Sequence, residues 1–186
     1  YINPWRILRT DQPADVILVS HDHYDRCSLA DINKLRGDQT RIIGNERVAQ
    51  EIPGCTVLLP WQSIAVDRVC IKAVPAYDPS DPRPAAKDSG LGFVISANYY
   101  DIYYAGDTGV IPEMASIHPD IAILPIDGRG TLSPQQAAEV TDQMRPRWVI
   151  PCNWSLSSSG ANKVDAALFQ REVGSKSEVV LLTPDR

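Results

Sequence analysis

Apolar and polar residues follow two different patterns along the chain. An apolar run at residues 15–19 predicts a strand, and Ser28 and Gly37 are suited to begin and end a helix after it. A second strand is expected at 40–43, followed by a short helix at 45–52. The first part of the chain therefore predicts two βα units.

The middle of the chain changes to short apolar strands separated by turns. We expect these strands at 56–59, 63–66, 69–74, 91–97 and 101–105. After residue 120 the βα alternation resumes, with strands expected at 121–124, 148–150 and 178–182 and helices at 134–144 and 163–173. Antiparallel strands flanked on both sides by βα units predict two packed sheets with helices outside them.

Length and composition narrow the expectation further. A chain of 186 residues with 44% hydrophobic content suits one α/β domain over residues 1–186. Its net charge of -5 offers no basic stripe, so we expect no nucleic-acid partner. No apolar run reaches the roughly 18 residues of a membrane helix, so we expect no membrane partner. Four scattered cysteines without a disulfide-scaffold spacing favour a cytoplasmic protein.

The residues with the most informative chemistry come directly after the first strand: His21, His23 and Asp25. In an extended segment, residues two positions apart point to the same side, so these three side chains can converge beyond the strand end. Imidazoles and carboxylates are ligands that suit Zn²⁺, Mn²⁺ or Fe²⁺. The spacing therefore predicts a metal site, and the alternative is an ordinary polar loop.

Four segments resemble a known family. Residues 20–27 are similar to the His-x-His-x-Asp-His signature of the metallo-β-lactamase superfamily, with Arg26 at the place of the last histidine. Residues 74–77, 104–108 and 149–154 resemble, in the family's order, later metal-bearing segments of the branch that contains ascorbate-lactonase-like hydrolases. The resemblance implies an αββα sandwich of two mixed sheets flanked by helices.

The first residues add a further expectation. Residues 1–5 resemble the place where the related branch, after its first strands, has the sequence Ile-Asp-Pro-Trp. By that comparison the chain lacks the N-terminal hairpin of the fold. Either the sequence is truncated, or an exposed sheet edge pairs with a second copy to form a homo-oligomer.

The resemblance also implies the ligands of a first metal ion. His21 and His23 stand in place, and Asp107 corresponds to the aspartate that bridges two ions. The third ligand position falls on Asp78 in some relatives and near Pro84 in others. Asp78 is chemically able to bind a metal, but it also suits a turn before a proline.

The second ion of the family pattern has fewer ligands here. Asp25 and Asp107 remain, whereas Arg26 and Asn153 replace histidines. A guanidinium stays protonated and cannot bind a metal, so we expect Arg26 to lie between the two carboxylates as a counter-ion. The alternative is a solvated arginine. Asn153 can donate a hydrogen bond to a substrate oxygen.

The superfamily's chemistry depends on a metal ion that lowers the pKa of water and polarises the bond under attack. The resemblance thus implies a hydrolase-like protein for a small-molecule substrate, with at most one divalent ion (Zn, Mn or Fe). Asp25 would orient the water or accept its proton as the catalytic carboxylate. We expect weak or lost activity on an ester, lactone or phosphoester. The alternative function is a metal-free module that binds a small ligand.

Overall fold

The computed structural model describes residues 1–8, 10, 12–81, 90–154 and 163–182. The first part of the chain contains β1 (Val16–Leu18), α1 (Leu29–Leu35), β2 (Arg41–Gly44), α2 (Glu46–Glu51) and β3 (Cys55–Val57). The middle contains β4 (Ser63–Val66), β5 (Val69–Ala76), β6 (Gly90–Ala97) and β7 (Tyr100–Tyr104). The last part contains the 3-10 helix η2 (Pro112–Ser116), β8 (Ile121–Pro125), α3 (Pro134–Met144), β9 (Trp148–Cys152), α4 (Lys163–Val173) and β10 (Glu178–Val179).

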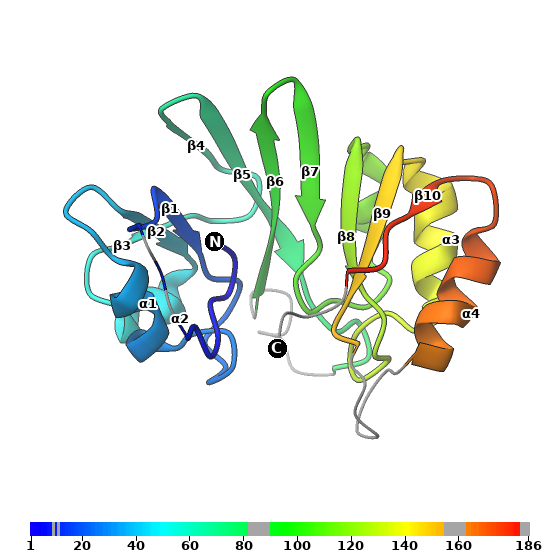
Figure 1. Cartoon of the computed structure of the whole chain (residues 1–186), viewed down its shortest axis with the longest axis horizontal. Helices are drawn as coiled ribbons and strands as arrows, with labels where there is room; N and C mark the ends of the chain where they lie inside the picture. Colours follow the sequence, from blue (N-terminus) through cyan, green and yellow to red (C-terminus); the bar gives the residue numbers. More distant parts are fainter. Residues whose placement is uncertain (9, 11, 82–89, 155–162, 183–186) are drawn as a thin grey trace.

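These strands form two sheets. The small sheet has the order β1-β2-β3 and is parallel throughout its described strands. The large sheet has the order β10-β9-β8-β7-β6-β5-β4, antiparallel from β4 to β7 and parallel from β7 to β10. Figure 1 shows α1 and α2 beside the small sheet, and α3 and α4 at the opposite end of the molecule, against the large sheet. The predicted αββα architecture is confirmed, and mixed pairing is found in the large sheet.

Side-chain alternation on the strands divides the buried residues among the layers. In β1, Ile17 packs with Ile32 of α1 in the cluster between the helices and the small sheet. The next residue, Leu18, points to the other face and packs with Ile43 and Phe93 between the two sheets. One short strand thus contributes to two layers of the core.

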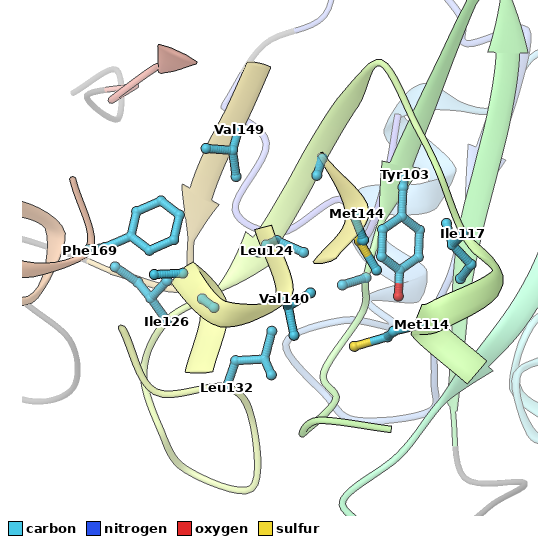
Figure 2. Close-up of a cluster of buried hydrophobic side chains, with 14 of the residues drawn as sticks. Tyr103, Met114, Ile117, Leu124, Ile126, Leu132, Val140, Met144, Val149 and Phe169 are labelled. Atoms are coloured by element: carbon cyan, nitrogen blue, oxygen red, sulfur yellow. The ribbon is translucent and has the colours of Figure 1, made fainter. Parts of the chain in front are cut away.

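The largest cluster of buried side chains lies on the outer face of the large sheet. Figure 2 shows Tyr103, Leu124 and Val149 of β7, β8 and β9 facing side chains such as Met114 and Phe169 from the helical layer. All five side chains are at most 2% exposed. Burial of this apolar surface holds α3 and α4 against the sheet.

Local capping explains why the helices begin where the sequence predicts. Ser28, Asn45 and Ser133 are the N-cap residues of α1, α2 and α3, and each side chain accepts a hydrogen bond from the backbone N–H three residues later. The bounds of α3 and α4 are those expected from the sequence. Because each capping hydrogen bond spans only three residues, the helix starts can be predicted without knowledge of the tertiary structure.

The last two strands differ from expectation. We expected 148–150 and 178–182, whereas β9 continues to Cys152 and β10 stops at Val179. Val149 O accepts a hydrogen bond from Val180 on the β10 side, and Cys152 O accepts one from Ile126 on the β8 side. By this alternation the nitrogen of Pro151 faces the side where β10 has already ended, so no ladder bond is lost and proline is tolerated within the strand.

The topology gathers the strand ends that carry the candidate site. Strands β5, β7, β8 and β9 run in one direction, so their carboxyl ends share an edge of the large sheet. A hydrogen bond of 2.8 Å from Leu91 N to Ser20 O joins the end of the β1 segment to the same edge. Residues 1–3 pair along the outer side of β1, including a parallel bridge between Ile2 and Leu18. Among the described residues, no helix is long and apolar enough to cross a membrane.

Candidate metal centre

The candidate site is built by loops that follow three strands. His21, His23, Asp25 and Arg26 come after β1, Asp107 comes after β7, and Asn153 comes after β9. The structure brings these side chains into one group. Asp78, the remaining predicted ligand, lies apart from them and is described below. Of the three side chains predicted to converge, His21 and His23 lie side by side, whereas Asp25 contacts Arg26.

His21 lies at the centre of this group. Its Nε2 atom is 3.6 Å from Oδ2 of Asp107, and its ring centroid is 4.4 Å from that of His23. Burial lowers the pKa of His21, and the neighbouring His23 and Arg26 lower it further, while Asp107 and Asp22 oppose the shift. The imidazole is consequently neutral at neutral pH, the form in which it can bind a metal.

The orientation of His21 depends on residues that the sequence analysis did not identify. Ser20 Oγ is 2.8 Å from Nδ1 of His21, and Asn3 donates to Ser20 Oγ at 2.9 Å and to the Tyr104 hydroxyl at 2.9 Å. With Nδ1 engaged in this way, Nε2 is the nitrogen left facing Asp107. Asn3, Ser20 and Tyr104 all lie in segments that resemble the family, at residues 1–5, 20–27 and 104–108, but nothing in those segments marked them as partners of His21.

Asp107 reaches the site because of the conformation of the residue before it. Gly106 has a φ of +72°, in the left-handed region that glycine adopts without strain. A Cβ atom on Gly106 would also lie 2.7 Å from the carbonyl oxygen of Leu91. Both constraints require glycine here and direct the chain so that Asp107 faces the histidines.

Arg26 points into the group rather than into solvent. Its Nη1 donates to Asp25 Oδ2 at 3.0 Å, and its Nη2 is 3.4 Å from both carboxylate oxygens of Asp107. Burial alone would lower the pKa of Arg26, but Asp107, Tyr104 and Asp25 outweigh it and raise the pKa above its ordinary value. The guanidinium is a permanent cation between two carboxylates.

Asn153 closes this arrangement. Its Oδ1 accepts from Arg26 Nη2 at 3.2 Å, and its Nδ2 donates to Asp107 Oδ1 at 3.1 Å. The backbone of Asn153 has a φ of 58°, a left-handed conformation that asparagine tolerates better than most residues. The hydrogen bonds of Asn153 are made within the protein, to Arg26 and Asp107.

Asp78 has a different environment from the other predicted ligands. Its Oδ1 accepts hydrogen bonds from the backbone nitrogen of Ser80 at 2.9 Å and from the Ser80 hydroxyl at 2.6 Å. This is the turn arrangement that we weighed against a ligand role. Within the described chain, no contact joins Asp78 to His21 or His23, and the alternative position near Pro84 lies outside the described residues.

The donor set fits one metal ion in part. Two ligand atoms that share a tetrahedral zinc ion at about 2.1 Å are about 3.4 Å apart, close to the 3.6 Å between His21 Nε2 and Asp107 Oδ2. That separation is too long for a good hydrogen bond. However, over residues 1–8, 10, 12–81, 90–154 and 163–182, no group of three or more histidine, cysteine or acidic side chains is already arranged to hold an ion. The exposed His23 would have to move to complete the set.

An αββα sandwich with histidines and aspartates gathered at one sheet edge defines a protein of the metallo-β-lactamase class. Comparison with known families agrees, since the model of the beta-lactamase superfamily domain matches residues 1–153. The chain belongs to this family.

Individual relatives extend the match over most of the chain. A UPF0173 metal-dependent hydrolase of Thermococcus onnurineus is 32% identical over 182 residues, which cover 92% of this chain and 80% of that protein. Its counterpart in Thermococcus kodakarensis is 31% identical, covering 98% of this chain and 85% of the relative.

Solved structures show the same fold. A candidate metal-dependent hydrolase from Parabacteroides distasonis superposes with a TM-score of 0.85 at 25% identity, covering 97% of this chain and 82% of that one. A metallo hydrolase from Ignicoccus hospitalis superposes with a TM-score of 0.75 at 22% identity, covering 93% of this chain and 78% of that one, and supports the fold alone.

Proposed function

We propose that this protein is a metal-dependent hydrolase that uses one divalent ion. His21, His23 and Asp107 would hold the ion, and a small ester, lactone or phosphoester would be the substrate. The observation that carries the proposal is the 3.6 Å separation of His21 Nε2 and Asp107 Oδ2, which suits two ligands of one ion better than a hydrogen bond. The relatives named as metal-dependent hydrolases support the same conclusion.

When bound, a divalent ion supplies Lewis acidity and makes water easier to deprotonate. The chain's own residues account for the remaining requirements. Asp25 is paired with Arg26 and has a side chain that is 35% exposed, so it can orient a water molecule or accept its proton. Arg26 forms an ion pair of 3.0 Å with Asp25 and adds positive charge near a developing anion.

We expect the activity to be weak. A second ion would stabilise the developing negative charge and orient the nucleophile, but on the Asp25 side a guanidinium fills the space between the carboxylates. A guanidinium provides one charge and hydrogen-bond donors, and it cannot make water acidic as a metal can. The proposed enzyme would thus polarise its substrate with one ion, and it would lack the charge stabilisation that a second ion supplies.

A specific observation favours a second candidate, a metal-free module that binds a small ligand. Arg26 already forms ion pairs with both Asp25 and Asp107, and no preformed group of three ligands exists within the chain as described. In this alternative, the edge of the large sheet retains a polar cleft without metal chemistry.

Metal analysis separates the two candidates. The protein should be purified without a histidine tag or chelator, analysed for bound metals, and titrated with Zn²⁺, Mn²⁺ and Fe²⁺ under anaerobic conditions. One ion per chain, accompanied by weak hydrolysis of 4-nitrophenyl acetate or bis(4-nitrophenyl) phosphate, supports the hydrolase. A stoichiometry near zero for all three ions supports the binding module, and Asp107→Asn serves as the variant expected to lose the ion.

A further inference from the structure

Two hydrogen-bonding side chains, Arg26 and Asn153, meet at the Asp107 carboxylate in the candidate site. Arg26 contacts Asp25, Asp107 and Asn153, and Asn153 in turn contacts Asp107. Each contact has the correct polarity, because the guanidinium donates to oxygens and the amide both accepts from Arg26 and donates to Asp107. Arg26 and Asn153 therefore act on Asp107 together and not as independent neighbours.

The two oxygens of Asp107 face different partners. Oδ1 accepts from Asn153 Nδ2 at 3.1 Å, whereas Oδ2 faces His21 Nε2 at 3.6 Å. Arg26 Nη2 lies 3.4 Å from both oxygens. The carboxylate group is thus held from one side, and its hydrogen bond of 3.1 Å is made by Oδ1 and not by the oxygen that faces His21.

The surroundings favour a strong effect of this arrangement. The Arg26 side chain is 19% exposed, and those of Asp25 and Asp107 are 35% and 26% exposed. Two partly buried carboxylates that both contact one guanidinium would repel each other if no cation lay between them. The planar fork of an arginine can reach both of them at once, which a lysine cannot do.

We propose that Arg26 and Asn153 form a clamp, supplied by the protein itself, that takes the place of a second cation between Asp25 and Asp107 and positions Asp107 Oδ2 toward His21. Both are positioning residues, because they act through Asp107. The part of the proposal that concerns a metal ion rests on the proposed function. The part that concerns the two carboxylates holds with or without a metal.

The first test measures melting temperatures of metal-free protein for Arg26→Ala, Asn153→Ala, the double variant and Arg26→Lys. We expect Arg26→Ala to lower the melting temperature by roughly 5 °C, with little recovery in Arg26→Lys. The melting-temperature decrease of the double variant should be smaller than the sum of the two single decreases, by at least about 2 °C, because the two side chains share a network. Arg171→Ala is the control, since Arg171 forms an ion pair of 2.8 Å with Glu172 but its side chain is 74% exposed.

The second test adds Zn²⁺ at saturation. Zinc should raise the melting temperature of Arg26→Ala by more than that of the parent, because the ion relieves the repulsion that Arg26 otherwise relieves. Asn153→Ala should fold well and bind Zn²⁺ about tenfold more weakly than the parent, since Asp107 loses an orienting bond. Arg26→His combined with Asn153→His should raise the stoichiometry above that of the parent.

The outcomes distinguish the clamp from the proposed function. If the parent binds no metal but Arg26→Ala is destabilised and the double variant is non-additive, the hydrolase proposal fails and the clamp stands. If Arg26→Ala melts like the parent with and without Zn²⁺, or if the two substitutions are additive, the clamp is overturned. Unchanged Zn²⁺ affinity in Asn153→Ala, in a parent that binds zinc, would overturn the positioning role.

Discussion

The two sides of Asp107 differ in what can balance the negative charge of its carboxylate. On the imidazole side, neutral His21 faces a carboxylate oxygen at a distance that leaves room for a cation, and the exposed His23 lies beside His21. On the guanidinium side, Arg26 and Asn153 already provide the positive charge and the hydrogen-bond donors. In our proposal, the clamp of Arg26 and Asn153 takes the place of one cation, and the donors on the imidazole side hold the other.

This difference has a structural basis behind each side. The imidazole side is supported by Asn3 and Ser20, which fix the orientation of His21 from the small sheet. The guanidinium side is supported by strand ends of the large sheet, after β7 and β9. The candidate site therefore depends on how the two sheets are placed against each other.

The largest expected effect tests whether the imidazole side holds the ion. His21→Ala should weaken binding of Zn²⁺ by more than about 100-fold, because it removes a ligand and not merely an orienting partner. Isothermal titration of the variant and the parent measures this loss. His118→Ala is the control, because His118 precedes β8 and lies at the other edge of the sheet. Equal Zn²⁺ affinity of His21→Ala and the parent would show that the imidazole side does not hold the ion.

A second prediction concerns Asp31, a carboxylate that is bound by side chains and backbone nitrogens and, unlike Asp107, is not proposed to bind a metal ion. Asp31 accepts from Lys34 Nζ at 2.8 Å, from Ser28 Oγ at 2.8 Å and from the backbone nitrogens of Arg6 and Ile7 at 2.9 and 3.0 Å. The hydrogen bond from Lys34 is the main cause that lowers the pKa of Asp31 to about 2; Ser28 and the two nitrogens add to it, and burial opposes it. These bonds hold the segment that follows Asn3.

Because the folded-state pKa of Asp31 lies below its unfolded value, its stabilisation is present above about pH 4 and is lost as the pH falls toward 2. We expect a contribution of about 2 kcal/mol after allowing for the half-exposed Lys34. Urea unfolding at pH 7 and pH 2 should show that Asp31→Asn lowers stability mainly at pH 7. Asp142→Asn, which breaks an ion pair of 2.9 Å with Lys176 between half-exposed side chains, should cost well under about 1 kcal/mol. A loss for Asp31→Asn that is the same at both pH values would contradict the assignment.

The smallest effect is expected for the residue that orients His21. Ser20→Ala should weaken Zn²⁺ binding about tenfold, because His21 remains packed in place. This is the lower end of the effect, about 10- to 100-fold, that is typical of residues that hydrogen-bond to a metal ligand. Ser116→Ala, an exposed serine bonded to the Glu113 carbonyl, should leave the affinity unchanged. If Ser20→Ala binds like the parent, packing alone orients His21, and the imidazole side needs no support from Asn3.

The sequence predicted most of the fold because the relevant signals are local. Capping residues such as Ser28 and Ser133 mark helix starts through bonds that span three residues. Residue spacing predicted that His21 and His23 lie together. The family resemblance supplied Asp107 and Asn153 and the expected position of Arg26 between Asp25 and Asp107. The strand end at Val179 was missed because it depends on a neighbouring strand and not on the residues of β10 themselves.

By itself, the sequence determined the elements, their layer order and the residue types at the candidate site, since periodicity, caps and motif spacing are properties of short segments. The tertiary structure decided which oxygen of Asp107 faces His21, and that Arg26 points inward to Asp107 and Asn153, which are 81 and 127 residues away in the chain. It also placed Asp78 in a turn with Ser80 and brought Asn3 to Tyr104, 101 residues later. Such contacts depend on how two sheets pack and on the direction of individual side chains, and no local pattern records either.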